Sequence, residues 1–178
     1  MGGVLFAQDK KQEAFAELNR AIELNPQRVE SYLSLARFHV LTNDIATAET
    51  IYQRAISVSG GSAMAHYEYG KFLVGAQRID EAEAAFQKAI QVEPSNREAR
   101  FIIASFYLVN KRLDKAEEAY KALAEIDKDK PEGRSVLGDF YSSVGRLDEA
   151  IAIYKEVLTK SPDYTQAHYR LEIGRAHV

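Results

Sequence analysis

The chain repeats one arrangement of small and bulky apolar residues. A small residue recurs every 34 residues, at Ala14, Ala48, Ala82, Ala116 and Ala150. A bulky residue follows each of them four positions later, at Leu18, Tyr52, Phe86, Tyr120 and Tyr154. A spacing of four places both columns on the same face of a helix. Because no insertion breaks the period, we interpret the chain as a set of internal repeats, which is typical of a solenoid.

A second pattern precedes the first in each repeat. A mostly apolar column at Leu35, Tyr69, Ile103 and Leu137 is followed each time by a small residue, at Ala36, Gly70, Ala104 and Gly138. Each repeat therefore predicts two helices, and the small column predicts a position where the two backbones approach closely. Breaks such as Gln77-Arg78 and Gly145-Arg146 separate them.

The ends of the second helices also have signals in the sequence. Pro26, Pro94 and Pro162 predict where these helices stop, because proline cannot extend a helix. We expect the second helices to be capped at their N-termini by aspartates, namely Asp80, Asp114 and Asp148. Ser62 is expected to cap a first helix.

With this period, these small and bulky columns and a proline between units, the chain resembles the tetratricopeptide repeat (TPR) family. The resemblance covers nearly the whole chain. It implies an all-α fold, namely an α-solenoid, a right-handed superhelix of antiparallel helix-pair repeats. Two junctions depart from the family pattern: Gly60 stands where proline is usual, and so does Lys128, with Pro131 three residues further on.

The repeats predict the domain organisation. We expect a single TPR array over residues 1–171, with a partial repeat at 1–28, full repeats at 29–62, 63–96, 97–130 and 131–164, and the start of a truncated repeat at 165–171. Residues 172–178 leave the pattern, with Glu172 in the small column, and their back-translation resembles a sequencing adapter. We interpret them as a non-native tail and the chain as a segment of a longer TPR protein.

Composition narrows the possible functions. Apolar residues make up 46% and charged residues 28%, the balance of a folded chain, and the net charge of −3 does not favour nucleic acid. The absence of cysteine excludes disulfides, thiolate zinc sites and cysteine catalysis. No apolar run is long enough to span a membrane. The compartment stays open between the cytoplasm and a bacterial periplasm, because any signal peptide would lie upstream.

The residue types that carry catalysis are not grouped. His39, His66 and His168 fall on columns where aromatic residues pack, without the spacing of a helical metal site, so we interpret them as core residues. The carboxylates occur in runs such as "DEAEAAF", which are typical of solvated helix faces. The sequence therefore predicts no enzyme activity, no metal and no cofactor.

In the TPR family the first helices line a concave surface where partners usually lie. That resemblance implies groove positions in three columns: Leu33, Tyr67, Phe101 and Ser135; then Arg37, Lys71, Ser105 and Asp139; then Val40, Val74, Leu108 and Ser142. The apolar members form a strip, with Arg37 and Lys71 supplying positive charge and Asp139 negative charge. The chaperone-type carboxylate clamp of the family is absent, because its positions hold Leu33, Arg37, Glu68, Glu98 and Ile102.

Three functional hypotheses follow. The first is a scaffold that binds a protein or peptide partner in this groove; the second is the substrate-recognition or regulatory arm of a larger enzyme such as a transferase. The third is self-association through the uncapped ends of the array. The strip could also be ordinary packing between repeats, and the sequence does not identify a partner.

Overall fold

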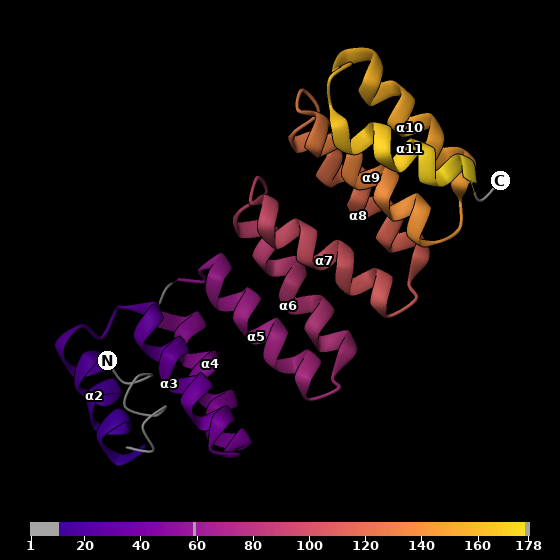
Figure 1. Ribbon diagram of the computed structural model, residues 1–178. Helices are drawn as coiled ribbons and strands as arrows, with labels where there is room; N and C mark the ends of the chain where they lie inside the picture. Colours follow the sequence, from indigo (N-terminus) through magenta and orange to yellow (C-terminus); the bar gives the residue numbers. More distant parts are fainter. Residues whose placement is uncertain (1–10, 59, 177–178) are drawn as a thin grey trace. The chain divides into compact units, whose positions relative to one another are not determined.

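The computed structural model describes residues 11–58 and 60–176, and every regular element in them is an α-helix (Figure 1). The chain divides into two compact units, Met1–Pro94 and Ser95–Val178. The first contains α2 (Lys11–Leu24), α3 (Val29–Leu41), α4 (Ile45–Val58), α5 (Ala63–Gly75) and α6 (Ile79–Val92). The second contains α7 (Arg97–Val109), α8 (Leu113–Ile126), α9 (Pro131–Ser143), α10 (Leu147–Lys160) and α11 (Thr165–Ala176).

Each full repeat expected from the sequence contains one helix pair. The pairs are α3 with α4, α5 with α6, α7 with α8, and α9 with α10, and the two helices of each pair pack against each other. Within each unit the pairs also contact their neighbours, α4 packing on α5 and α8 on α9. The all-helical solenoid repeat predicted from the sequence is therefore confirmed.

The turn inside each pair has the same backbone geometry every time. One residue adopts a left-handed conformation, at Asn43, Gln77, Lys111 and Gly145, with φ of 61°, 61°, 58° and 79°. In the α5–α6 turn, the Arg78 N–H donates to the Leu73 carbonyl and the Gln77 N–H to the Val74 carbonyl. This pair of bonds is the Schellman motif, which satisfies carbonyls left free at a helix end.

The prolines act as predicted, but the aspartates do not. Helices α2, α6 and α10 end two residues before Pro26, Pro94 and Pro162. Helix α6 already begins at Ile79, with Arg78 as its N-cap, so Asp80 lies within the first turn and is not a cap.

The other two expected caps are wrong for the same reason. Arg112 and Arg146 occupy the N-cap positions of α8 and α10, in place of the expected Asp114 and Asp148. Where that position is an aspartate, it does cap: Asp44 accepts a hydrogen bond from the Thr47 N–H at 3.3 Å. Ser62 is the N-cap residue of α5, but its side chain makes no capping hydrogen bond.

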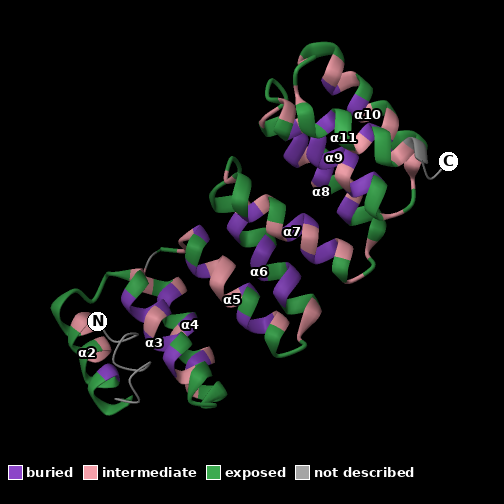
Figure 2. Ribbon diagram, in the orientation of Figure 1, coloured by how far each residue is buried: buried purple, intermediate pink, exposed green. Residues whose placement is uncertain are grey.

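The aromatic column is the core of each unit, as predicted. Tyr52, Phe86, Tyr120 and Tyr154 are only 2–5% exposed, and the purple, buried segments of Figure 2 run along the inner faces of the helices. The small column faces these rings. A Cβ added at Gly70 would lie 2.5 Å from the Phe86 ring, and one added at Gly138 would lie 2.6 Å from the Tyr154 ring.

Carboxylates of the second helices are less solvated than the sequence predicted. In the first unit, Glu49 of α4 accepts hydrogen bonds from Arg78 at 2.7 and 2.8 Å and from the Tyr69 hydroxyl at 2.8 Å. Glu83 is only 7% exposed. These acidic residues therefore belong to the packing within and beside the helices and do not form a purely solvated face.

The second unit contains a similar ion network. Glu117 of α8 accepts from the Tyr141 hydroxyl at 3.0 Å and pairs with Arg146 and with Lys121. Lys121 and Arg146 hold the pKa of Glu117 down to about 2. This network therefore connects α8 to the turn before α10 through charge-assisted hydrogen bonds.

The two ends of the chain can be compared with the sequence only in part. Residues 1–10 of the predicted partial repeat lie outside the described residues. At the other end, α11 does not end with the predicted truncated repeat at residue 171 but continues to Ala176, through most of the segment that leaves the repeat pattern. Glu172 is exposed, whereas a Cβ added at Gly174 would lie 3.4 Å from Ile151, in ordinary contact. The non-native origin of residues 172–178 stays a prediction.

Candidate functional site

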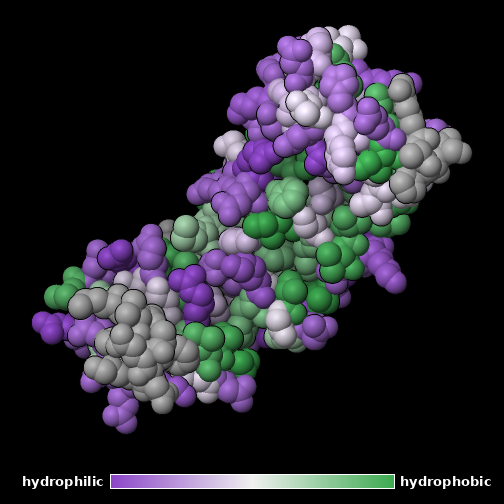
Figure 3. All heavy atoms as spheres, in the orientation of Figure 1, coloured by the Kyte–Doolittle hydropathy of each residue, from purple (hydrophilic) through white to green (hydrophobic). Residues whose placement is uncertain are grey.

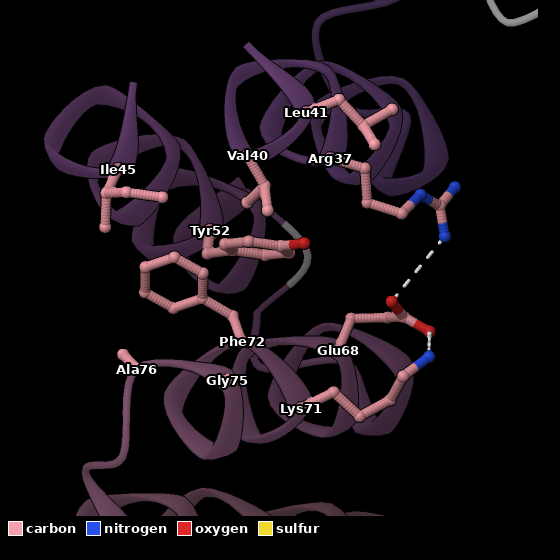
Figure 4. A pocket seen from close by; sticks show the side chains of 10 residues that line it. All are labelled: Arg37, Val40, Leu41, Ile45, Tyr52, Glu68, Lys71, Phe72, Gly75 and Ala76. Atoms are coloured by element: carbon pink, nitrogen blue, oxygen red, sulfur yellow. Dashed lines mark hydrogen bonds and ion pairs between the residues drawn. The ribbon is translucent and has the colours of Figure 1, made fainter. Parts of the chain in front are cut away.

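A groove of about 500 Å³ opens in the first unit, between α3 and α5 with α4 behind them (Figure 4). It lies at the C-terminal halves of α3 and α5, next to the start of α4. Its lining is mostly apolar, and the residues are Arg37, Val40, Leu41, Ile45, Tyr52, Glu68, Lys71, Phe72, Gly75 and Ala76. Grooves of this size with a few polar groups at one side are typical of ligand and peptide sites.

One side of the groove is an exposed apolar surface. Val40 and Leu41 end α3, Ile45 begins α4, and these residues are 37%, 64% and 42% exposed. Phe72 of α5 and Ala76, the residue that follows α5, lie across from them in Figure 4. On the face drawn in Figure 3, green hydrophobic areas are likewise bordered by hydrophilic residues. Exposed apolar side chains gathered in a concavity favour contact with a partner.

The other side of the groove is charged. Glu68 lies between two cations: its Oε1 is 3.0 Å from Lys71 Nζ, and its Oε2 is 3.6 Å from Arg37 Nη1. Lys71 also lies over the Tyr67 ring, 5.1 Å from its centroid. The positive charge expected from Arg37 and Lys71 is thus partly neutralised by Glu68, which leaves one net positive charge at this side.

Tyr52 lies between the apolar and charged sides. It is 3% exposed, and its ring packs against Phe72 with centroids 5.1 Å apart. In Figure 4 its hydroxyl points toward the side of the groove that holds Arg37 and Glu68. Burial raises the pKa of Tyr52 to about 12, so this hydroxyl stays protonated and can donate a hydrogen bond.

The structure places only part of the predicted groove residues of the first unit at this groove. Arg37, Val40 and Lys71 line it. Tyr67 and Val74 are half-buried and are not among the lining residues, Tyr67 packing near the Phe86 ring at 6.0 Å. Leu33 is 2% exposed. Its expected place on the surface is wrong, because its side chain is part of the core of the unit.

The predicted residues of the second unit differ in how far they are exposed and in what they contact. Phe101 is 43% exposed and packs edge-on against Tyr120, and Leu108 is half-buried. Ser105 shares a hydrogen bond of 3.2 Å with the Tyr120 hydroxyl. Ser135 is 1% exposed and donates to the Pro131 carbonyl at 2.7 Å, so its expected exposure is wrong.

Asp139 is engaged inside the second unit. It accepts a hydrogen bond from the Tyr154 hydroxyl at 2.8 Å and pairs with Arg170 at 2.8 Å. Burial raises its pKa. The negative charge expected on this part of the surface is therefore compensated within the protein.

Sequence reasoning missed the residues at the ends of the helices. Leu41, Ile45, Phe72, Gly75 and Ala76 line the groove but lie outside the three columns that the family geometry implied. Leu41 and Ile45 flank the α3–α4 turn, and the repeat pattern predicts only a break between helices there. The sequence does contain a signal for this surface: apolar residues on both sides of an exposed turn are not typical of a solvated loop and indicate a contact surface.

The histidines differ from one another. His39 is half-buried between the rings of Phe15 and Phe38, and its Nδ1 lies 3.0 Å from Asp44 Oδ2. His66 is half-buried, and burial lowers its pKa. His168 is exposed and its Nε2 is 2.7 Å from the Pro162 carbonyl oxygen, so its expected core position is wrong.

The described part of the chain contains neither a cluster of metal-ligating side chains nor a helix that could span a membrane. Among residues 11–58 and 60–176, no three histidine, cysteine or acidic side chains are grouped as a metal site would require. In the same residues, none of the helices combines the length and the hydropathy needed to cross a bilayer.

Stacked antiparallel helix pairs with a fixed period and a groove beside the first helices define a TPR protein. Residues 32–161 match the family model described as the cilia and flagella-associated protein 70 middle TPR-like domain, and the chain belongs to this family. A search of curated protein sequences gives no match.

Solved structures show the same fold. The crystal structure of MamA aligns with a TM-score of 0.65 and 22% identity, covering 93% of this chain and 97% of that one. YrrB is described as a TPR protein with an unusual peptide-binding site. It aligns with a TM-score of 0.58 and 20% identity, covering 94% of this chain and 87% of that one. A thermophilic TPR protein from Thermus thermophilus aligns with a TM-score of 0.57 and 24% identity, covering 98% of this chain and 95% of that one. At these identities the likeness establishes the fold.

Proposed function

We propose that the chain is a protein-interaction scaffold that holds a peptide or helical segment of a partner protein in the groove between α3, α4 and α5. The observation that carries this proposal is the exposed apolar lining of that groove. Leu41, Ile45 and Val40 are 64%, 42% and 37% exposed although they border a concavity of about 500 Å³. Covering them removes apolar surface from water, at about 25 cal/mol per Å².

The shape and chemistry of the groove support a peptide. Its residues come from three helices, so an extended or helical segment can contact α3 and α5 together. Apolar anchors with a charged group beside them are typical of grooves that bind amphipathic segments. The matching family model describes a TPR-like domain, and YrrB, which shares the fold, is described as a TPR protein with an unusual peptide-binding site. The role here is binding, without chemistry on the partner.

The test uses a display library of random twelve-residue peptides, selected against the full chain. Synthetic copies of the selected peptides are titrated by fluorescence anisotropy. Leu41→Ser combined with Ile45→Ser should weaken binding about 10-fold or more, because both side chains lose apolar contact area. Circular dichroism must show that the variant is folded, which we expect because both positions are at exposed helix ends.

Val92→Ser is the matched control. Val92 is also an exposed apolar residue of the first unit, 48% exposed, but it does not line the groove. Its substitution should leave the dissociation constant within about 2-fold. A library that enriches no peptide, or peptides that bind the folded groove variant as tightly as the parent, would refute the proposal.

A further inference from the structure

The second-helix tyrosines divide into two groups by what their hydroxyls contact. Tyr120 shares a hydrogen bond with Ser105, and Tyr154 donates to Asp139; in each case the partner lies 15 residues earlier in the chain. Tyr52 occupies the same position of its repeat, but the residue 15 positions before it is Arg37. A guanidinium only donates hydrogen bonds, so it cannot accept the proton of the Tyr52 hydroxyl.

The Tyr52 hydroxyl therefore lacks an acceptor. Among the residues that the structure describes, none forms a hydrogen bond with it, although the residue is only 3% exposed. No fully buried side-chain polar atom of the described residues is unpaired, so this hydroxyl reaches the water of the groove, where an acceptor of a ligand can replace that water. The same column holds Phe86, without a hydroxyl, where the residue 15 positions earlier is Lys71. Tyr52 is thus the residue of this aromatic column whose hydroxyl donates no hydrogen bond to the described part of the chain.

The charges around the hydroxyl indicate the kind of acceptor. Arg37, Glu68 and Lys71 together carry one net positive charge, and the side chains of Arg37 and Lys71 are 53% and 49% exposed, against 12% for Glu68. Arg37 is 3.6 Å from the Glu68 carboxylate, longer than a hydrogen bond, and makes only a 3.4 Å contact to Ser34 Oγ. Its guanidinium keeps donors available for an incoming anion.

We propose that this groove selects a partner segment in which an acidic side chain stands beside large apolar residues. The carboxylate accepts a hydrogen bond from Tyr52 and pairs with Arg37, while the apolar residues cover Val40, Leu41 and Ile45. This inference rests on the proposed function and makes it specific: Tyr52 and Arg37 determine specificity, and the apolar surface supplies most of the contact area.

The experiment compares acidic peptides with their amides. Peptides selected by display should be enriched in aspartate or glutamate next to leucine, isoleucine or phenylalanine. Replacing that acid by the corresponding amide should weaken binding to the parent chain about 10-fold or more, since hydrogen bonds to charged groups are the stronger ones. In the Tyr52→Phe variant the same replacement should change the dissociation constant by less than about 3-fold, because the hydroxyl that donates the hydrogen bond is absent.

Tyr120→Phe is the matched control for Tyr52→Phe. It removes a hydroxyl of the same column that the fold already uses, so it should lower the melting temperature and leave the acid preference intact. Tyr52→Phe should leave the melting temperature unchanged, because no hydrogen bond within the described chain is lost.

The outcomes separate this inference from the proposed function. If selected peptides lose affinity in Leu41→Ser/Ile45→Ser but bind equally as acid and amide, the groove binds peptides and the acidic selectivity is refuted. If the acid preference persists in Tyr52→Phe and disappears at 500 mM salt, long-range attraction explains it and the role of Tyr52 is refuted. If no peptide is enriched, both proposals fail.

Discussion

Gly70→Ala is expected to destabilise the first unit, although alanine is the better helix former. Gly70 lies inside α5, where replacing glycine by alanine ordinarily gains about 1 kcal/mol. A Cβ at this position would, however, lie 2.5, 2.6 and 3.1 Å from three carbons of the Phe86 ring. Since carbon atoms pack at about 3.5–4.0 Å, the ring would have to move by about 1 Å.

Phe86 has little room to move. It is 2% exposed, and its ring lies 6.0 Å from the Tyr67 ring. Overpacking a core costs about 1–3 kcal/mol, and an overlap of this size belongs at the upper end of that range. After subtracting the gain in helix propensity, we expect Gly70→Ala to lower the free energy of unfolding by about 2 kcal/mol.

The assay is urea unfolding followed by circular dichroism at 222 nm. Gly75→Ala is the matched control, because Gly75 also lies in α5 and a Cβ there would meet nothing within 4 Å. It should be neutral or stabilising by up to about 1 kcal/mol. Adding Phe86→Leu to Gly70→Ala should cost less than the two single losses combined, since the smaller side chain relieves the overlap. If Gly70→Ala stabilised as much as Gly75→Ala, the close approach of α5 and α6 would be wrong.

Three further predictions follow from the repeated positions. Phe86→Ala should lower the free energy of unfolding by about 3–5 kcal/mol in the same assay, and a loss below about 1 kcal/mol would contradict its core position. Gln77→Gly should raise the free energy of unfolding by about 0.5–1 kcal/mol, because φ of Gln77 is 61° and glycine adopts this conformation without strain. Gly145→Ala, at the same turn position, should lower the free energy of unfolding. Changes of the opposite sign would contradict the left-handed turn geometry. The pKa of Glu117 falls to about 2 in the folded state from an ordinary value of 4.5. The contribution of the Glu117 carboxylate to the stability of the folded protein is therefore complete above pH 4.5 and is lost as the pH falls toward 2. The melting temperature of Glu117→Gln should therefore change less over that range than that of the parent or of the exposed control Glu118→Gln, and identical profiles would contradict the role of the network.

The repeat positions were predictable because they are fixed by local geometry. The spacing of Ala82, Phe86 and Ala89 determines which face of α6 is buried, and all three are buried. The stop at Pro94 follows from the missing backbone N–H of proline. These features depend on residues within one repeat, so the sequence contains them in full.

The groove was predicted less well because it depends on packing between helices. Leu33 and Arg37 are one helical turn apart on α3, yet Leu33 is 2% exposed and Arg37 lines the groove. Which of two neighbouring positions becomes buried is decided by how the surrounding helices pack on α3, and the column pattern does not record that packing. The prediction for the acidic run "DEAEAAF" fails for the same reason, because Glu83 was expected on a solvated helix face and is only 7% exposed.

The tyrosine column carries stability at one repeated position, and we propose that one of its members also carries recognition. Its rings are buried in every repeat, so the ring itself is a structural requirement. Its hydroxyl is not, because Phe86 lacks one, and its use depends on the residue 15 positions earlier. Ser105 and Asp139 offer an acceptor and thereby bind the hydroxyl within the fold, whereas Arg37 offers none. A single difference on a neighbouring helix therefore leaves the Tyr52 hydroxyl without this acceptor while the ring stays buried, and this difference is the basis of the recognition that we propose.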